Sequence, residues 1–181
     1  MTGKPATLSR PAALPRERGE SESRALVDPV TRLWNQDSIL GILDRELARI
    51  RREVGVVSVV RAEVDFYRRI LDEWGPEAGH PVLRYVARHF RGWVRTYDAV
   101  GRYGESGFLA VLPGCGRADA TIKAETIRRI VAAVPVPVAE GRQVRVTLST
   151  GVAEGRTDSR EVVLAAAEAL RRVRKANPSR A

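Results

Sequence analysis

The spacing of apolar residues predicts a chain that alternates between helices and strands. Apolar residues from Ile39 to Ile50 recur at helical spacing between acids and arginines, which predicts an amphipathic helix that ends near Arg52. The stretch 54–64 is β-branched and almost continuously apolar, which is typical of a buried central strand. A short helix that ends near Trp74 should follow this strand, because Gly75 and Pro76 interrupt the chain there.

The remaining pattern completes an α+β fold. It predicts a helix with Pro81 in its first turn and apolar residues up to Val94, a hairpin of strands 99–103 and 108–112, a helix over 117–134, a strand over 145–152 and a helix over 161–176. This order is typical of a ferredoxin-like, palm-type fold with a central antiparallel sheet flanked by helices. We expect the helices to cover one face of the sheet.

Composition agrees with a single folded domain. The chain has 181 residues, of which 44% are hydrophobic and 29% charged, and this is the composition of a globular protein. Residues 1–25 hold three prolines among Ser, Arg and Glu without apolar periodicity, so we expect a flexible tail, a domain over 26–177 and a short tail over 178–181.

Several classes of protein are disfavoured. No apolar run is long enough to cross a bilayer, and the N-terminus lacks the apolar core of a signal peptide. The one cysteine, Cys115, has no partner for an internal disulfide. We therefore expect a cytoplasmic protein without a membrane partner.

The net charge is a weaker indication. It is +9, which suggests a polyanionic partner such as nucleic acid. All but three of the 31 basic residues are arginines, however, and they are scattered along the chain without forming one block. A general bias toward arginine explains this pattern as well, so nucleic-acid binding is a hypothesis that draws on charge alone.

Four segments and a pair of glycines carry the functional signal. The first two segments read Asp-Pro-Val-Thr-Arg-Leu-Trp-Asn over 28–35 and Glu-Val-Asp-Phe-Tyr-Arg-Arg-Ile over 63–70, and Gly75 and Gly79 follow. The other two read Arg-Tyr-Gly-Glu-Ser-Gly-Phe over 102–108 and Val-Thr-Leu-Ser-Thr-Gly-Val-Ala over 146–153. In this order they resemble the GGDEF domain of bacterial diguanylate cyclases, which make cyclic di-GMP from two GTP molecules. The resemblance covers about residues 26–177 and implies the same fold.

The resemblance also indicates that the active site is degenerate. In the family, acids at the end of the central strand and in the hairpin hold metal ions for phosphoryl transfer, whereas this hairpin reads Gly-Glu-Ser-Gly-Phe. The family reads guanine with Asn and Asp and contacts phosphates with Lys and Arg; the matching positions here are Leu71 and His80, then Arg174, Asn177 and Pro178. The degenerate active-site positions are Glu63, Leu71, His80, Gly104, Glu105, Ser106, Gly107, Phe108 and Arg174.

We therefore expect no catalytic residues, no metal site and no cofactor; Mg²⁺ would matter only for residual cyclase activity. A register slip could bring Glu105 into the place of the missing acid, but a slip of one residue turns a strand side chain to the opposite face. His80 and His89 lack further ligands at metal-site spacing. We interpret His80 as an ordinary residue near the start of a helix.

A second family feature is retained. Arg95 and Asp98 form an R-x-x-D pattern that five residues separate from Gly104, and many family members bind cyclic di-GMP at this pattern as a product-inhibition site. An arginine can donate to guanine O6 and N7, and a carboxylate can accept from N1 and N2. The family often adds an arginine from the next helix, but the matching residue here is Thr126, and Arg128 lies two positions further on.

Four hypotheses remain open. The first is a catalytically inactive signalling module that binds cyclic di-GMP through Arg95 and Asp98 and relays it to a partner. The second is a nucleotide-independent module for protein interaction or homodimerisation, which Thr126 favours. The third is a residual cyclase, which would depend on Glu63, Asp65 and Arg174, and the fourth is nucleic-acid binding.

Overall fold

The computed structural model describes residues 26–139 and 141–176. The predicted tails lie outside these residues, and the domain boundaries stay a prediction. The elements are α1 Gln36–Ile50, β1 Val57–Val64, α2 Tyr67–Trp74, the short 3₁₀ helix η1 Pro76–Ala78, α3 Gly79–Trp93, β2 Ala99–Arg102, β3 Gly107–Pro113, α4 Arg117–Ala132, β4 Val136–Ala139, β5 Arg142–Val144, β6 Leu148–Gly155 and α5 Ser159–Ala176.

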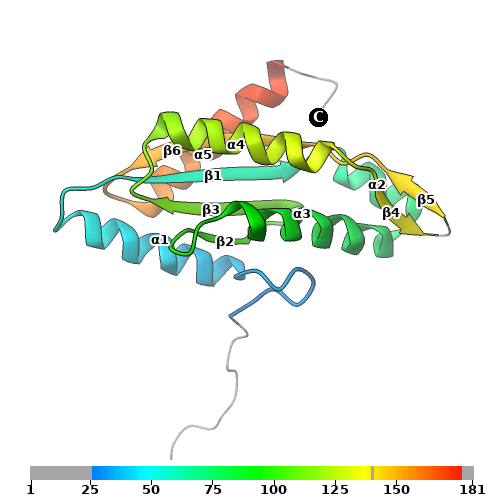
Figure 1. The fold of residues 1–181 in the computed structure, drawn as a ribbon, viewed down its shortest axis with the longest axis horizontal. Coiled ribbons are helices and arrows are strands. Elements are labelled where there is room, and N and C mark those ends of the chain that lie inside the picture. Colours follow the sequence, from blue (N-terminus) through cyan, green and yellow to red (C-terminus); the bar gives the residue numbers. More distant parts are fainter. Residues whose placement is uncertain (1–25, 140, 177–181) are drawn as a thin grey trace, which may run out of the picture.

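The core is an antiparallel sheet with the strand order β2-β3-β1-β6 (Figure 1). β1 is central and pairs with β3 on one side and β6 on the other. It is almost wholly buried, as its largely apolar sequence predicts. The α+β fold with a central antiparallel sheet is thereby confirmed.

The helices cover both faces of this sheet, so the expectation that they share one face was wrong. One apolar cluster joins α1 and α5 to alternate β1 residues, among them Val57 and Val59. The other joins α2, α3 and α4 to the intervening residues, among them Val60 and Ala62. A strand that is apolar at successive positions has two faces to bury, and this requires a helical layer on each side.

The structure also contains a second hairpin that the sequence pattern did not predict. Strands β4 and β5 form a separate two-stranded sheet after α4. Pro135 and Pro137 mark the end of a helix in sequence terms, and Pro137 also lies within a strand, a position that proline tolerates where no ladder donor is needed. β6 begins three residues later than predicted, at Leu148.

The segment before α1 covers the β2 edge of the main sheet. Trp34 bridges Gly101 in parallel, and the Arg102 N–H donates to the Trp34 carbonyl at 2.8 Å. Asp28 shapes this segment by accepting from both the backbone N–H and the hydroxyl of Thr31, at 2.7 and 2.6 Å. The side chain of Asn35 then caps α1 through the N–H of Ser38.

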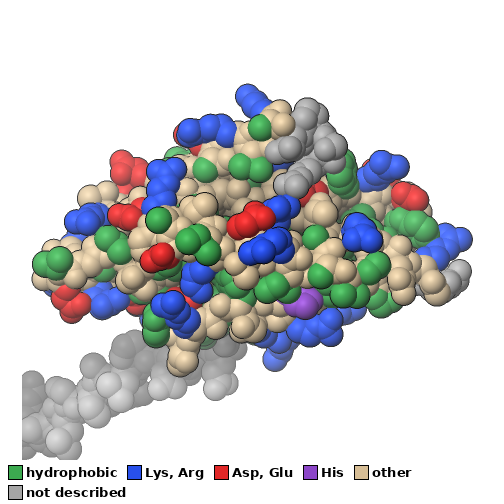
Figure 2. Space-filling model, turned by 45° about the horizontal axis from the view of Figure 1, so that its top comes forward, with side chains coloured by type: hydrophobic (Ala, Val, Ile, Leu, Met, Phe, Trp, Pro, Cys, Tyr) green, Lys and Arg blue, Asp and Glu red, His purple; other side chains and the backbone are tan. Residues whose placement is uncertain are grey.

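Charged side chains are dispersed over the surface. Figure 2 shows arginines and lysines interspersed with acidic and hydrophobic side chains on the visible face, without one continuous basic field. Cys115 is a buried free thiol, and burial raises its pKa.

Among residues 26–139 and 141–176, no helix is long and apolar enough to span a membrane.

Candidate functional site

The candidate site is built around the carboxyl-terminal end of β1, where Glu63 lies. The two ladders of β1 place Glu63 opposite Gly107 of β3 and Ser149 of β6. Strand side chains alternate between faces, so Arg61 and Glu63 project from the same face. The sequence therefore sets a cation beside the first acid of the site.

Two arginines occupy the Glu63 carboxylate. Arg61 Nη2 donates to Glu63 Oε1 at 2.7 Å, and Arg174 Nη1 donates to Glu63 Oε2 at 2.6 Å. The Glu63 side chain is only 22% exposed, so these charge-assisted bonds are partly shielded from solvent. The Arg61 guanidinium also lies over the Tyr103 ring, 4.3 Å from its centroid. Each oxygen that a metal ion would need thus already binds a guanidinium.

Asp65, the second acid, is part of the protein interior. Its side chain is fully buried and accepts hydrogen bonds from the hydroxyls of Thr147 at 2.7 Å and Ser149 at 2.6 Å. Arg174 Nη2 lies 3.7 Å from Asp65 Oδ1. These contacts join the end of β1 to β6 and α5, because buried carboxylates require donors.

The hairpin leaves no room for an acid opposite Glu63. A Cβ added to Gly107 would collide with the Tyr103 carbonyl oxygen and approach Glu63 Cγ to 3.4 Å. The Tyr103 N–H donates to the Gly107 carbonyl at 2.9 Å, which closes the turn at this point. A side chain at position 107 would therefore require the hairpin to shift.

Arg102 holds the same turn from the side. Its guanidinium donates to the carbonyls of Glu105 and Gly107, both at 2.6 Å, and lies 5.1 Å from the centroid of the Phe108 ring. Burial lowers the pKa of Arg102, and the nearby Asp28 carboxylate partly offsets this. The turn is thus fixed by a partly buried cation.

The other hairpin residues have structural contacts. Gly104 adopts φ +75°, which glycine tolerates, and its N–H donates to Gln36 at 3.0 Å. The Ser106 carbonyl accepts from Val64 at 3.1 Å, which extends the ladder in the predicted register. The Glu105 carboxylate instead pairs with Arg68 at 2.9 Å, where both side chains are exposed, so it does not join Glu63.

The two positions that would read guanine carry no matching donors and acceptors. Leu71 packs against the main core, and its Cδ2 lies 2.7 Å from the place where a Cβ on Gly79 would stand. His80 lies in the first turn of α3, and its Nδ1 is 3.4 Å from Glu77 Oε2. A leucine side chain forms no hydrogen bonds, so of these two residues only His80 can exchange a hydrogen bond with a ligand.

Arg95 and Asp98 lie in the turn between α3 and β2, but their side chains differ in exposure. Arg95 is exposed, and its Nη1 donates to the Tyr97 hydroxyl at 2.9 Å, which raises the pKa of Arg95. The Asp98 side chain is only 2% exposed, and its Oδ2 accepts from the Arg95 backbone N–H at 2.9 Å. Asp98 thus also fixes the turn that presents Arg95.

The helix after the hairpin contributes a lysine to this turn. Lys123 Nζ lies 3.7 Å from Asp98 Oδ2 and 4.7 Å from the centroid of the Trp93 ring. Thr126 is occupied by a bond to the Ile122 carbonyl, and Arg128 pairs with Glu125. The α4 cation that approaches Asp98 is therefore Lys123, which lies about one helical turn before Thr126.

Within the part of the chain that the structure describes, no group of three or more His, Cys, Asp or Glu side chains could hold a metal ion. Arg174 contacts Glu63 and Asp65 as set out above, whereas Asn177 and Pro178 lie outside the described residues. The residues at the end of β1 thus do not fit a divalent cation, because the carboxylate that would bind it is neutralised by two guanidinium groups.

The chain is thus an α+β domain with a palm-type antiparallel sheet, carboxylates at the end of its central strand and a tight hairpin beside them. Residues 25–180 match the family model described as diguanylate cyclase, GGDEF domain. The chain therefore belongs to the GGDEF domain family.

Similar proteins agree with this assignment. Diguanylate cyclase DosC of Escherichia coli K12 is 34% identical over 168 residues, which is 91% of this chain and 36% of the relative. The diguanylate cyclase SiaD of Pseudomonas aeruginosa, solved in complex with its activator SiaC, superposes with a TM-score of 0.79 at 31% identity and covers 84% of this chain and 59% of that one. The GGDEF domain of DgcB from Caulobacter crescentus, solved with cyclic di-GMP, shares the fold, with a TM-score of 0.82 at 23% identity over 87% of this chain and 94% of that one.

The chain spans about a third of the length of the curated relatives it matches, 36% of DosC and 32% of the response regulator PleD of Caulobacter vibrioides.

Sequence reasoning missed two residues of the candidate site. Arg61 was detectable, since it precedes Glu63 by two positions in a strand and must share its face. Lys123 was not, because its proximity to Asp98 depends on how α4 packs beside α3, and no local pattern reports that packing.

Proposed function

We propose that this chain is a catalytically inactive GGDEF signalling module that binds cyclic di-GMP through Arg95 and Asp98 and relays its presence to a partner protein. The observation that carries the inactivity is the occupation of both Glu63 oxygens by Arg61 and Arg174. A divalent ion at this carboxylate would have to displace two charge-assisted hydrogen bonds and would lie beside two positive charges. The module accordingly requires no metal cofactor.

Two further features support inactivity. Gly107 stands where the family has a glutamate, and the Tyr103 carbonyl fills the space of any side chain there. Leu71 and His80 replace the pair that reads guanine. Under this proposal, metal binding and base selection both lack the residues that they require.

The exposed Arg95 supports cyclic di-GMP binding. Its guanidinium lies 5.9 Å from the centroid of the Tyr97 ring, and Tyr97 is 61% exposed. An exposed guanidinium can donate to guanine O6 and N7 while an adjacent ring offers a surface on which a base stacks. The turn held by Asp98 presents both groups outward.

The second candidate function, a nucleotide-independent interaction or homodimerisation module, is favoured by a different observation. The Asp98 carboxylate is buried and already engaged by the Arg95 N–H and by Lys123. To accept from a guanine it would have to give up contacts that stabilise the turn. Under this alternative the R-x-x-D residues only maintain the fold.

Calorimetric titration of cyclic di-GMP separates the two functions. We expect heat of binding with the wild-type chain and with Arg160→Ala, an exposed arginine on α5, and loss of binding in Arg95→Ala. Asp98→Asn keeps an acceptor for the Arg95 N–H but removes the charge, so it tests the carboxylate without removing its structural bond. Absence of binding in the wild type would leave the interaction module, and unchanged affinity in Arg95→Ala would place the ligand elsewhere.

A separate assay addresses residual cyclase activity. We expect no cyclic di-GMP and no linear intermediate when the chain is incubated with GTP and either Mg²⁺ or Mn²⁺, alone or mixed with an active homologue. Product formed by this chain and lost in Glu63→Gln would overturn the proposed inactivity.

A further inference from the structure

The main sheet has one covered edge and one open edge. The segment at Trp34 pairs with β2 at the first edge. On the outer side of β6, no other strand pairs within residues 26–139 and 141–176. β6 is eight residues long and contains no lysine or proline, which are residues that commonly protect an exposed edge.

The ladder pattern determines which β6 groups face outward. The Val64 N–H donates to Ser106 before β3, and the Asp65 N–H donates to Thr147 before β6. Antiparallel ladders alternate, so even-numbered β1 residues bond toward β3 and odd-numbered ones toward β6. Thr150 and Val152 lie opposite the even-numbered Ala62 and Val60, so their N–H and C=O groups point away from the sheet.

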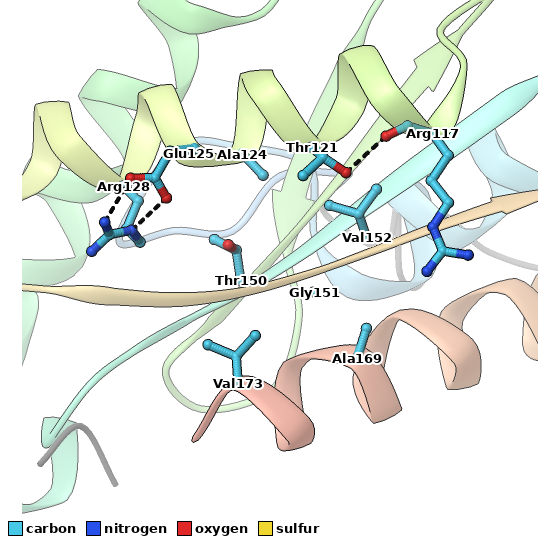
Figure 3. Close-up of a pocket in the computed structure, with 10 residues that line it drawn as sticks. All are labelled: Arg117, Thr121, Ala124, Glu125, Arg128, Thr150, Gly151, Val152, Ala169 and Val173. Atoms are coloured by element: carbon cyan, nitrogen blue, oxygen red, sulfur yellow. Dashed lines mark hydrogen bonds and ion pairs between the residues drawn. The ribbon is translucent and has the colours of Figure 1, made fainter. Parts of the chain in front are cut away.

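A groove follows this open edge. It has a volume of about 330 Å³, and Figure 3 shows it between α4 and α5, with Thr150, Gly151 and Val152 along its floor. Its helical walls carry small side chains, with Ala124 on α4 and Ala169 on α5. Backbone donors and acceptors in an apolar channel of this kind suit an added strand, because the main chain of an extended segment supplies the matching groups.

Charge at the groove favours an acidic occupant. In Figure 3 the Arg117 side chain extends from the start of α4 across β6 toward α5, and no described residue accepts a hydrogen bond from its guanidinium. Arg128 lines the other end and is paired with Glu125 at 2.6 and 2.8 Å. Arg117 is thus the cation at the groove whose guanidinium is free to bind an acidic group. A second copy of this chain docked at β6 would instead bring another Arg117 to the interface.

We propose that the β6 edge is a docking site for an extended segment of a partner protein, which adds to β6 as a strand and places an acidic side chain against Arg117. Main-chain bonds to Thr150 and Val152 would supply affinity, and Arg117 would supply selectivity. The proposal does not depend on cyclic di-GMP binding, because the edge lies on α4, β6 and α5 rather than on the turn that holds Arg95.

A displayed library of ten-residue peptides tests the proposal on the full chain. Alternate positions are fixed as Val or Thr and the others are random, and the strongest binder is then synthesised with a fluorophore and titrated by anisotropy. We expect selected peptides to contain Asp or Glu at one shared position. Arg117→Glu should weaken the strongest binder by about tenfold or more, since it replaces attraction by repulsion.

A backbone variant distinguishes strand addition from other modes of binding. Val152→Pro removes an outward N–H and leaves the β1 ladder bonds in place, so it should also weaken binding by about tenfold, whereas the matched Val152→Thr should not. Failure to select any binder, binders without an acidic residue, or unchanged affinity in both Arg117→Glu and Val152→Pro would overturn the proposal. So would sedimentation showing that the free chain dimerises through this edge.

Discussion

At the scale of single residues, the contacts around the end of β1 support one another. Gly107 permits the Tyr103 carbonyl to approach, Arg102 holds the resulting turn through two carbonyls, and Glu63 across the ladder is held by Arg61 and Arg174. A side chain introduced at position 107 would therefore meet the Tyr103 carbonyl, beside a carboxylate that two guanidinium groups already bind.

Gly107→Ala should destabilise the fold by about 1–3 kcal/mol, since a Cβ at this place requires the hairpin backbone to move. Gly92→Ala is the matched control, because Gly92 lies in α3 with nothing within 4 Å of an added Cβ, and alanine is the better helix former. Urea denaturation of both variants provides the measurement. Equal free energies of unfolding for Gly107→Ala and Gly92→Ala would show that the turn over 103–107 can shift at little cost.

His89 should make the fold weaken on acidification. Burial lowers its pKa, and the positive Arg88 acts in the same direction, while His89 Nε2 is buried without a hydrogen-bond partner among the described residues. The unfolded chain therefore binds the proton more tightly, and stability contributed by neutral His89 is lost as the pH falls through about 6.5 toward the lower folded value.

Unfolding free energies of the wild type and of His89→Gln at pH 7.5 and pH 5 measure this effect. The loss between the two pH values should be smaller in the variant. An equal loss in both proteins would assign the pH dependence to other groups.

At the scale of elements, two glycines determine how closely helices approach the sheet. A Cβ on Gly151 would collide with the Ala166 carbonyl and the Leu170 N–H of α5, so this helix lies directly on β6. The side chain of Val162 likewise occupies the space where a Cβ on Gly155 would stand. The position of α5 matters for function because this helix carries Arg174 to Glu63 and forms one wall of the groove along β6.

Gly151→Ala should cost about 1–3 kcal/mol of stability, since it forces α5 away from β6. It should also change the environment of Arg174, which α5 positions. Gly41→Ala in α1, where nothing lies within 4 Å of the added Cβ, should leave stability equal or higher. Thermal melts of the two variants provide the comparison, and a Gly151→Ala protein as stable as the wild type would contradict close packing of α5.

The sequence predicted helices and strands correctly where a single pattern of apolar residues, helical or extended, dominated a segment. The helical spacing before Arg52 and the apolar run of β1 each specify one structure, and α1 and β1 confirm them. The β4–β5 hairpin was not predicted, because two prolines next to it indicate only where a helix ends. The two-sided covering of the sheet follows from tertiary packing, although the apolar residues at both odd and even positions of β1, such as Val59 and Val60, were a signal for it.

The candidate site was predictable in part for the same reason. The hairpin positions and Glu63 were singled out by their spacing in the sequence, and the ladder places Gly107 opposite Glu63. The burial of Asp98 and the approach of Lys123 depend on contacts between distant segments. Local sequence does not encode such contacts, so the R-x-x-D pattern alone did not reveal that its acid is engaged.

At the scale of the whole molecule, the distribution of charge matters more for binding a polyanion than the net charge does. The chain carries +9, but many arginines pair with acids, as at Glu46 with Arg49 and at Glu125 with Arg128. Such interspersed pairs reduce the field that would attract a phosphate backbone, because adjacent opposite charges cancel at a distance.

We therefore expect weak binding to nucleic acid. A labelled 20-base-pair duplex should show no saturable anisotropy change with about 10 µM protein at physiological salt, where basic DNA-binding proteins often bind non-specifically with Kd of about 1–100 µM. Saturable binding that weakens steeply as salt is added would indicate a basic surface sufficient for a polyanion.

The covered β2 edge also limits assembly. A domain with two free edges could extend its sheet at both ends, and repeated addition would then build a fibre. Here the Trp34 segment occupies the β2 edge, so each copy of this chain offers only the β6 edge of its main sheet. Two copies that paired through β6 would leave no further edge for a third, so copies of this chain cannot polymerise by repeated pairing of these edges.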